Sequence, residues 1–157
     1  MLISNFFSLF TQCDGQYDEV SLHKQFDGWE MGQIEKYPMH RYQIVVDNTV
    51  VGSIDFRQSN DPWLYWGGHI GYNIAPNYRG NHYAYKACMA LKPIMESYGF
   101  DSVIITASPD NLASIKTILK LGCEFLEQTT VPQGHWLMKQ NEPIKRIYKW
   151  HLDHELK

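Results

Sequence analysis

Apolar residues recur along this chain with two different periods, and these periods predict where strands and helices lie. Two runs rich in valine and isoleucine, 42–47 and 49–56, are typical of strands, and the Asp-Asn pair at their junction predicts a tight hairpin. Gly52 within the second run indicates a bulge. A third run, 64–74, alternates apolar and polar positions, so we expect it to be the next antiparallel strand.

Helical periodicity appears further along the chain. Residues 83–98 carry apolar side chains at helical spacing and predict a helix. The segment 101–107 is typical of a buried strand, and a helix before it implies a parallel right-handed crossover. Ser108-Pro109 is predicted to begin a second helix, which Gly122 would end.

Both ends of the chain are predicted from weaker patterns. A first strand is expected at 3–10, and helices are expected at 17–26 and 29–37. After the helix that Gly122 would end, the pattern predicts further strands at 124–131, 135–139 and 144–151. No repeat or linker divides the sequence, so residues 1–157 are predicted to form one domain, and periodicity alone gives its class as α/β or α+β.

The composition agrees with a globular protein. Hydrophobic residues make up 44% of the 157 residues and charged residues 20%. A net charge of −3 argues against a general nucleic-acid-binding surface. The 3 cysteines have no metal-ligand spacing, which suits a reducing compartment. The apolar N-terminal segment has no basic leader and is too short to span a bilayer, so a cytoplasmic protein is expected.

The junction between the third strand and the first long helix carries the strongest candidate chemistry. Pro76 ends the strand, and a polar loop, 79–82, leads into the helix. Such a loop aims backbone N–H groups at one point and adds the positive end of the helix dipole, which favours a phosphate site. An ordinary strand-to-helix connection is the alternative, because one glycine is weak evidence.

The residues around this loop resemble those of a known family. R-G-N-H-Y-A at 79–84 is similar to the acetyl-CoA loop Q/R-x-x-G-x-G/A of the GNAT superfamily of N-acetyltransferases, with His82 where that family has Gly. N-L-A-S-I-K-T-I-L-K-L-G-C at 111–123 resembles the family's N-x-x-A/S…L-G-F helix. G-G-H-I-G-Y in the preceding strand most resembles a group of predicted acetyltransferases and the ribosomal-protein alanine acetyltransferase branch. The resemblance covers roughly residues 41–150.

This resemblance implies both a fold and an activity. The fold would be α/β (α+β), with a mixed central β-sheet of about six to seven strands and helices on both faces. The activity would be acetyl-CoA-dependent transfer of an acetyl group to a primary amine of a small molecule or a protein N-terminus. Acetyl-CoA would be the co-substrate and no metal would be needed. A homodimer is expected by analogy alone, and neither nucleic acid nor membrane is an expected partner.

Two alternatives from other functional classes stay open. The chain would be a GNAT-fold module that binds CoA or a partner without catalysis, or a structural protein whose aromatic N-terminal half forms an interface. Two departures from the family pattern favour the first alternative: His82 in the loop, and Ile118 at the position where many members carry a catalytic tyrosine.

The resemblance also assigns residues to acetyl-CoA. The backbone of the loop would bind the pyrophosphate, the end of the preceding strand would bind the pantetheine arm, and two residues of the second helix would lie beside that arm. In this sequence these are Arg79, Gly80, Asn81, His82, Tyr83 and Ala84; Tyr72, Asn73 and Ile74; and Asn111 and Ser114. The N–H of Tyr72 would polarise the thioester carbonyl. For Asn111, capping of the helix is the alternative.

Acetyl transfer to an amine needs a group that accepts the ammonium proton. His69 stands where related sequences often carry Glu, and an ordinary histidine pKa near ~6.5 suits this role. A histidine hydrogen-bonded within the sheet is the alternative, and Asp55 is the second candidate for the base. Since Ile118 replaces the usual acid, Ser114 or Tyr148 would protonate the leaving thiolate, or the thiolate would leave without a side-chain acid.

Overall fold

The structure, a computed structural model, describes residues 12–152. In chain order its elements are β1 Gly15–Tyr17, β2 Val20–Met31, β3 Lys36–Val46, β4 Thr49–Arg57, α2 Leu64–Gly67, β5 Ile70–Ile74, the 3-10 turn η1 Pro76–Tyr78, α3 Tyr83–Ser97, β6 Ser102–Ala107, α4 Leu112–Lys120, β7 Glu124–Thr130, α5 Trp136–Lys139 and β8 Ile144–His151. Within this described part, no helix combines the length and apolarity that crossing a membrane requires.

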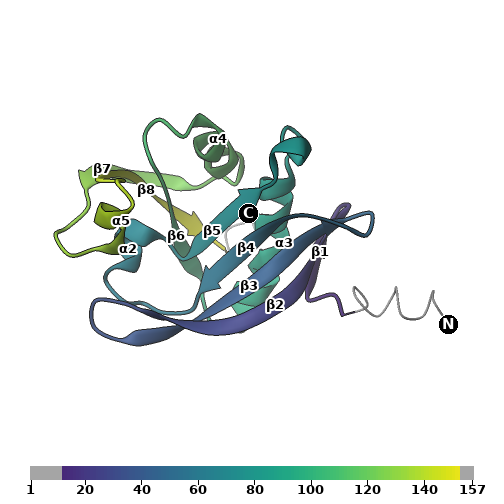
Figure 1. The fold of residues 1–157 in the computed structure, drawn as a ribbon, viewed down its shortest axis with the longest axis horizontal. Helices are drawn as coiled ribbons and strands as arrows, with labels where there is room; N and C mark the ends of the chain where they lie inside the picture. The colour runs from purple at the N-terminus through teal and green to yellow at the C-terminus, as the bar shows by residue number, and fades with distance from the viewer. Residues whose placement is uncertain (1–11, 153–157) are drawn as a thin grey trace.

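The strands form two sheets that meet at β5 and β6. One is an antiparallel sheet of 5 strands in the order β1-β2-β3-β4-β5, and the other has 3 strands in the order β6-β8-β7. Figure 1 shows α3 behind the larger sheet and α4 above the edge where the two sheets face each other. The predicted α/β (α+β) class is confirmed, and the strands expected in the central sheet are divided between these two sheets. The strand expected at 3–10 lies outside the described residues.

The predicted hairpin between β3 and β4 is confirmed. Asp47 and Asn48 both have positive φ angles, 50° and 60°, as a tight hairpin turn requires. A bulge follows, because Ile44 pairs with Gly52 whereas Val45 pairs with Val50. A side chain at Gly52 would also collide with β5, because a Cβ at this position would lie 2.1 Å from the backbone oxygen of Asn73.

Both helices predicted between residues 17 and 37 are wrong, since this region forms β1, β2 and the start of β3. Val20 and Leu22 are fully buried, and their spacing of two residues places both on one face of a strand. The turn between β2 and β3 is held from a distance by Asp61. Its carboxylate accepts hydrogen bonds from the N–H groups of Gln33 at 2.8 Å and Ile34 at 2.9 Å.

Three further elements differ from the prediction. The run 64–74 begins with the short helix α2, and only Ile70–Ile74 is a strand. The segment expected to be a strand at 135–139 forms α5, and the side chain of His135 caps it by accepting from Leu137 N–H at 3.1 Å. The second long helix begins at Leu112, not near Ser108-Pro109.

The core lies between the sheets and α3. One face of α3 is buried, with Ala87, Cys88, Leu91 and Met95 each 0% exposed. Fully burying a leucine or methionine side chain contributes about 1.5–3 kcal/mol, so this face fixes the position of α3 behind the sheets. The N-terminus of α3 therefore lies beside the end of β5, where the candidate site is found.

Candidate functional site

The two sheets are joined through His69 and then separate. His69 N–H donates to the carbonyl of Ile104 at 2.8 Å, and Ile104 N–H donates to the side-chain Nδ1 of His69 at 2.9 Å. Beyond this junction β5 pairs with β4 and β6 pairs with β8. A cleft of about 810 Å³ opens between β5 and β6 and extends to α3, α4 and α5.

The edge of β5 presents backbone groups to this cleft. Arg57 N–H donates to the carbonyl of His69, and Ala75 N–H donates to the carbonyl of Val51, so the odd-numbered residues of this segment pair with β4. Because strand residues alternate, the N–H and C=O groups of the residues between them point the other way. These residues are Ile70, Tyr72 and Ile74, and all line the cleft. An extended ligand rich in amides would pair with such an edge as an added strand.

The N-terminus of α3 lies at the end of the cleft next to Ile74. Gly80, with φ of 90°, and His82, with φ of 62°, turn the chain into the helix. A Cβ at Gly80 would meet no atom within 4 Å, so the approach to this loop is open. The first N–H groups of a helix have no partner within it, and the helix dipole is positive there. Both features favour an anionic ligand.

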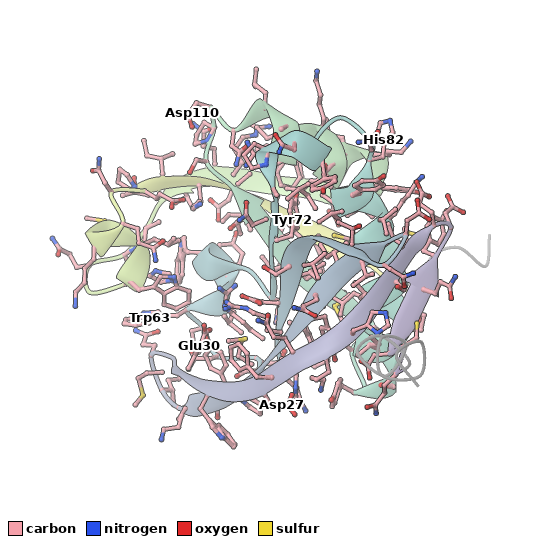
Figure 2. The ribbon with its side chains drawn as sticks, turned by 45° about the vertical axis from the view of Figure 1, so that its right-hand side comes forward. Asp27, Glu30, Trp63, Tyr72, His82 and Asp110 are labelled. Carbon is pink, nitrogen blue, oxygen red and sulfur yellow. The ribbon has the colours of Figure 1, made fainter. Side chains whose placement is uncertain are left out.

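His82 has the backbone conformation of a glycine. The left-handed region is unfavourable for residues with a Cβ, so His82 adopts a strained conformation that glycine would adopt freely. Its side chain is exposed, and Figure 2 shows it directed away from the molecule, whereas Tyr72 lies in the interior. The histidine therefore leaves the loop open.

We expect His82→Gly to stabilise the protein by about 0.5–1 kcal/mol, because glycine adopts this conformation without steric strain. In a protein of this size, 1 kcal/mol raises the Tm by about 2–4 °C, which thermal unfolding would detect. Asn81→Gly is the matched control, since Asn81 has no positive φ and should gain nothing. An unchanged or lowered Tm for His82→Gly would show that the histidine ring stabilises the loop.

The charge of the cleft is opposite to that of the chain. Among the described residues that line it, five are cationic and one is acidic, although the chain carries a net charge of −3. They are Arg57, Arg79, Lys116, Lys120 and Lys145, and Glu142. Arg79 also stabilises the loop, because its Nε donates to the carbonyl of Ile74 at 2.8 Å. Such a cleft attracts polyanionic ligands.

On α4 the structure brings Asn111 and Ser114 to the cleft. Asn111 caps the helix, because its Oδ1 accepts from Ser114 N–H at 3.2 Å. The hydroxyl groups of Ser114 and Tyr72 lie 2.8 Å apart and are hydrogen-bonded. Burial raises the pKa of Tyr72 well above its usual range, so the phenol is protonated at neutral pH. The pair can therefore donate a hydrogen bond into the cleft.

The prediction of His69 as the general base is corrected. Its side chain is 7% exposed, does not line the cleft, and uses both ring nitrogens: Nδ1 accepts from Ile104 N–H, and Nε2 donates to the carbonyl of Ser59 at 2.9 Å. Burial lowers the pKa of His69 to about 4. The imidazole is thus neutral at pH 7 and joins three segments of backbone.

Two other predicted side chains also lie away from the cleft. Tyr148 is 1% exposed in the core, and its hydroxyl accepts from Nε of Arg146 at 2.9 Å, so the prediction of an acid there is corrected. Asp55 binds Arg41 through both carboxylate oxygens, at 2.6 and 2.8 Å, and does not line the cleft. Ile118 is 0% exposed and packs in the core.

The far end of the cleft contains residues that the sequence analysis missed. Lys145 Nζ donates to Glu142 at 2.5 Å and to Ser108 Oγ at 3.3 Å. Burial raises the pKa of Glu142, but the hydrogen bond and charge of Lys145 and the hydrogen bond from Ser108 together outweigh it and hold the pKa below its usual value. Arg57 and Trp136 complete this end. Arg57 follows Asp55 by two residues on β4, so both side chains lie on the same face of the strand. This pair of charges was the sequence signal that could have indicated Arg57 as a functional residue.

Comparison with known proteins adds a family and a fold. The family model described as acetyltransferase (GNAT) domain matches residues 8–124. No protein of curated function matches the sequence. Among solved structures, the microcin self-immunity acetyltransferase MccE, in complex with acetyl-CoA and AMP, is 18% identical with a TM-score of 0.54, over 72% of this chain and 61% of that one.

Two further solved structures are similar to this chain at comparable identity. Mycobacterium smegmatis RimJ, in complex with CoA-disulfide, is 19% identical with a TM-score of 0.57, over 75% of this chain and 55% of that one. RimL, a ribosomal-protein α-N-acetyltransferase, is 17% identical with a TM-score of 0.56, over 73% and 70%. The chain thus spans about three fifths of MccE and just over half of RimJ. At identities this low, the similarity of the structures shows a common fold and nothing further.

Proposed function

Because the chain belongs to the GNAT acetyltransferase family, we propose that it is an acetyl-CoA-dependent N-acetyltransferase that acts on a primary amine of a small molecule or a protein N-terminus. One observation carries the proposal. The open edge of β5 runs into the N-terminus of α3 inside a cleft with five cationic side chains among its described lining residues. An elongated ligand with amides at one end and phosphates at the other matches this order of binding groups.

The residues of the cleft fit each part of acetyl-CoA. The N–H groups at the start of α3, together with Arg79, would hold the pyrophosphate, and Gly80 leaves room for it. Lys116 and Lys120 on α4 line the same cleft and would hold further phosphate charge. The backbone of Tyr72 and the N–H of Ile74, whose carbonyl accepts from Arg79, would pair with the pantetheine amides. Bound acetyl-CoA supplies an activated acetyl group as its thioester.

The chain's own groups would then act on the reacting atoms. Tyr72 N–H faces the cleft and would donate to the oxygen that gains negative charge, an oxyanion-type role. The Tyr72 and Ser114 hydroxyls would donate a hydrogen bond to the departing sulfur. Glu142 is a carboxylate at neutral pH, because its pKa is lowered, and would attract the substrate ammonium. The amine would lose its proton to water, and turnover would rise with pH toward the amine's own pKa.

The proposal predicts that acetyl-CoA stabilises the protein and that a suitable amine releases free thiol from it. At about 100 times the Kd, bound ligand adds about 2.7 kcal/mol to the free energy of unfolding. Thermal unfolding measures this shift, and a thiol reagent measures turnover with a panel of primary amines. ADP, which has the pyrophosphate without the pantetheine arm, should stabilise less. No stabilisation by acetyl-CoA would contradict the binding site.

A binding module without catalysis is the second candidate. The observation that favours it is that Glu142, the one acidic side chain among the described residues that line the cleft, is paired with Lys145. This carboxylate is therefore not a free base. The same two measurements separate the candidates, because a binding module would be stabilised by acetyl-CoA yet release no thiol with any amine.

A further inference from the structure

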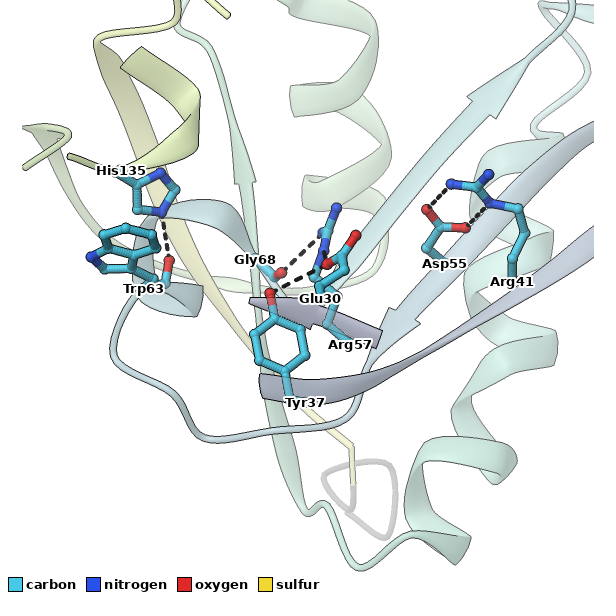
Figure 3. Close-up of polar contacts among 8 residues, drawn as sticks. All are labelled: Glu30, Tyr37, Arg41, Asp55, Arg57, Trp63, Gly68 and His135. Carbon is cyan, nitrogen blue, oxygen red and sulfur yellow. Dashed lines mark hydrogen bonds and ion pairs between the residues drawn. The ribbon is translucent and has the colours of Figure 1, made fainter. Parts of the chain in front are cut away.

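Arg57 presents part of its guanidinium to the far end of the cleft with donors to spare. Its Nε donates to Glu30 at 2.8 Å and its Nη1 to the carbonyl of Gly68 at 3.2 Å, as Figure 3 shows. A guanidinium has five N–H donors. Within residues 12–152 no acceptor is recorded for Nη2, so the terminal donors remain available to a ligand.

Gly71 on β5 leaves space in front of these donors. A Cβ at residue 71 would lie 3.6 Å from Nη1 and 3.7 Å from Nη2 of Arg57. The two terminal nitrogens are therefore nearly equidistant from that point, so both border the space above Gly71. Both residues line the cleft. A carboxylate or phosphate in this space could accept from both terminal nitrogens at once.

The surroundings of Arg57 strengthen an interaction with an anion. The side chain is 15% exposed, and its guanidinium lies 5.8 Å from the ring of Trp136. That ring is itself packed against the backbone, because a Cβ at Gly67 would lie 2.4 Å from it. A charge-assisted bond is worth more in such a partly buried place than at the surface. Glu30 is not among the described residues that line the cleft, so it holds the Nε edge without occupying the fork.

We infer that the acceptor carries an anionic group, a carboxylate or a phosphate, close to its amine, and that Arg57 binds this group above Gly71. The inference rests on the proposed function. Gly71 immediately precedes Tyr72, whose N–H faces the cleft, so an anion held by Arg57 keeps the attached amine beside the proposed position of the acetyl group. Glu142 at the same end suits the ammonium. The site then discriminates against amines that lack the anion.

Matched pairs of amines test this inference. L-Phenylalanine is compared with 2-phenylethylamine, and O-phosphoethanolamine with ethanolamine, which separates carboxylate from phosphate. For at least one pair we expect the anionic member to have a KM about tenfold lower. The Kd of each amine is also measured by calorimetry with CoA bound, which needs no turnover. In both measurements the preference should weaken with added salt.

Gly71→Ala is the decisive variant. The added methyl makes only ordinary van der Waals contact with Arg57, so the Tm should stay within about 1 °C, but the methyl occupies the space of the anion. The ratio of KM values within the preferred pair should fall toward one. Arg57→Gln should do the same if it folds. Arg41→Gln is the control, since Arg41 binds Asp55 on the same sheet face and does not line the cleft, and it should keep the preference.

The inference would be overturned by equal KM and Kd values within both pairs, or by a preference that survives Gly71→Ala. The failure of the proposed function looks different. In that case no amine releases thiol, yet the calorimetric preference for anionic amines and its loss in Gly71→Ala would still hold. If neither member of any pair binds in the presence of CoA, the inference is wrong even where acetyl-CoA itself binds.

Discussion

His69→Ala is expected to lower the free energy of unfolding by about 3–5 kcal/mol and to leave turnover per folded molecule nearly unchanged. The variant removes a buried ring and leaves two backbone groups without partners, Ile104 N–H and the carbonyl of Ser59. Chemical denaturation measures the loss, and turnover is measured at low temperature with saturating acetyl-CoA. His82→Asn is the control for stability alone, because its side chain is exposed and asparagine tolerates a positive φ.

The same histidine makes stability depend on pH in a defined direction. Its pKa is about 4 in the folded protein and near the ordinary 6.5 in the unfolded chain. The unfolded chain therefore binds more protons between these values, and stability rises with pH across this window. The contribution, about 3 kcal/mol, is complete above pH 6.5 and is lost as the pH falls toward 4. His69→Ala should flatten this part of the stability profile.

An opposite result would restore the role predicted from the sequence. If His69→Ala kept its stability but lost turnover by a hundredfold or more, His69 would be the general base. A break near pH 6.5 in the wild-type pH–rate profile that disappears in the variant would support the same conclusion.

Gly52→Ala is expected to destabilise the protein by about 3 kcal/mol. The new Cβ would lie 2.1 Å from the oxygen of Asn73 and 3.1 Å from the Cα of Ile74. Both contacts are with backbone, which cannot move without disturbing the β4–β5 pairing. Since Asn73 and Ile74 also line the cleft, the Kd for acetyl-CoA should rise as well.

Gly71→Ala is the matched comparison for stability, because it adds the same methyl on the neighbouring strand with its nearest contact at 3.6 Å. Denaturation midpoints of the two variants, measured under identical conditions, test the prediction. A Gly52→Ala midpoint equal to that of Gly71→Ala would mean that the bulge relaxes at no cost.

The parts of the fold that depend on local sequence were predictable. Asp47-Asn48 and the valine-rich runs predicted the β3–β4 hairpin, and the helical period after residue 82 predicted α3, because each signal lies within the element itself. The region before residue 40 was not predictable in this way. Its turn is held by Asp61, which lies 26 to 28 residues further along, and such a partner leaves no local pattern.

The same distinction between local and distant signals applies to the residues of the candidate site. The loop at 79–84 and Asn111 could be proposed as candidates because the loop and the capped helix are continuous in sequence. His69 was misassigned because its role depends on Ser59 and Ile104, which only the fold brings to its ring. Arg57 was missed for the same reason: nothing near it in sequence indicates that Gly71 lies in front of its guanidinium.

The junction at His69 has a mechanical consequence. Among the described residues, β5 and β6 are joined by the pair of hydrogen bonds between His69 and Ile104, and one of these uses the imidazole in place of a peptide group. The separation of the two strands is therefore fixed at this one point and not by a continuous series of backbone hydrogen bonds. A ligand bound between β5 and β6 would keep these two strands apart. The width of the cleft would then depend on the ligand as well as on the protein. A ligand paired with the edge of β5 would fill the gap that the fold leaves between the two sheets.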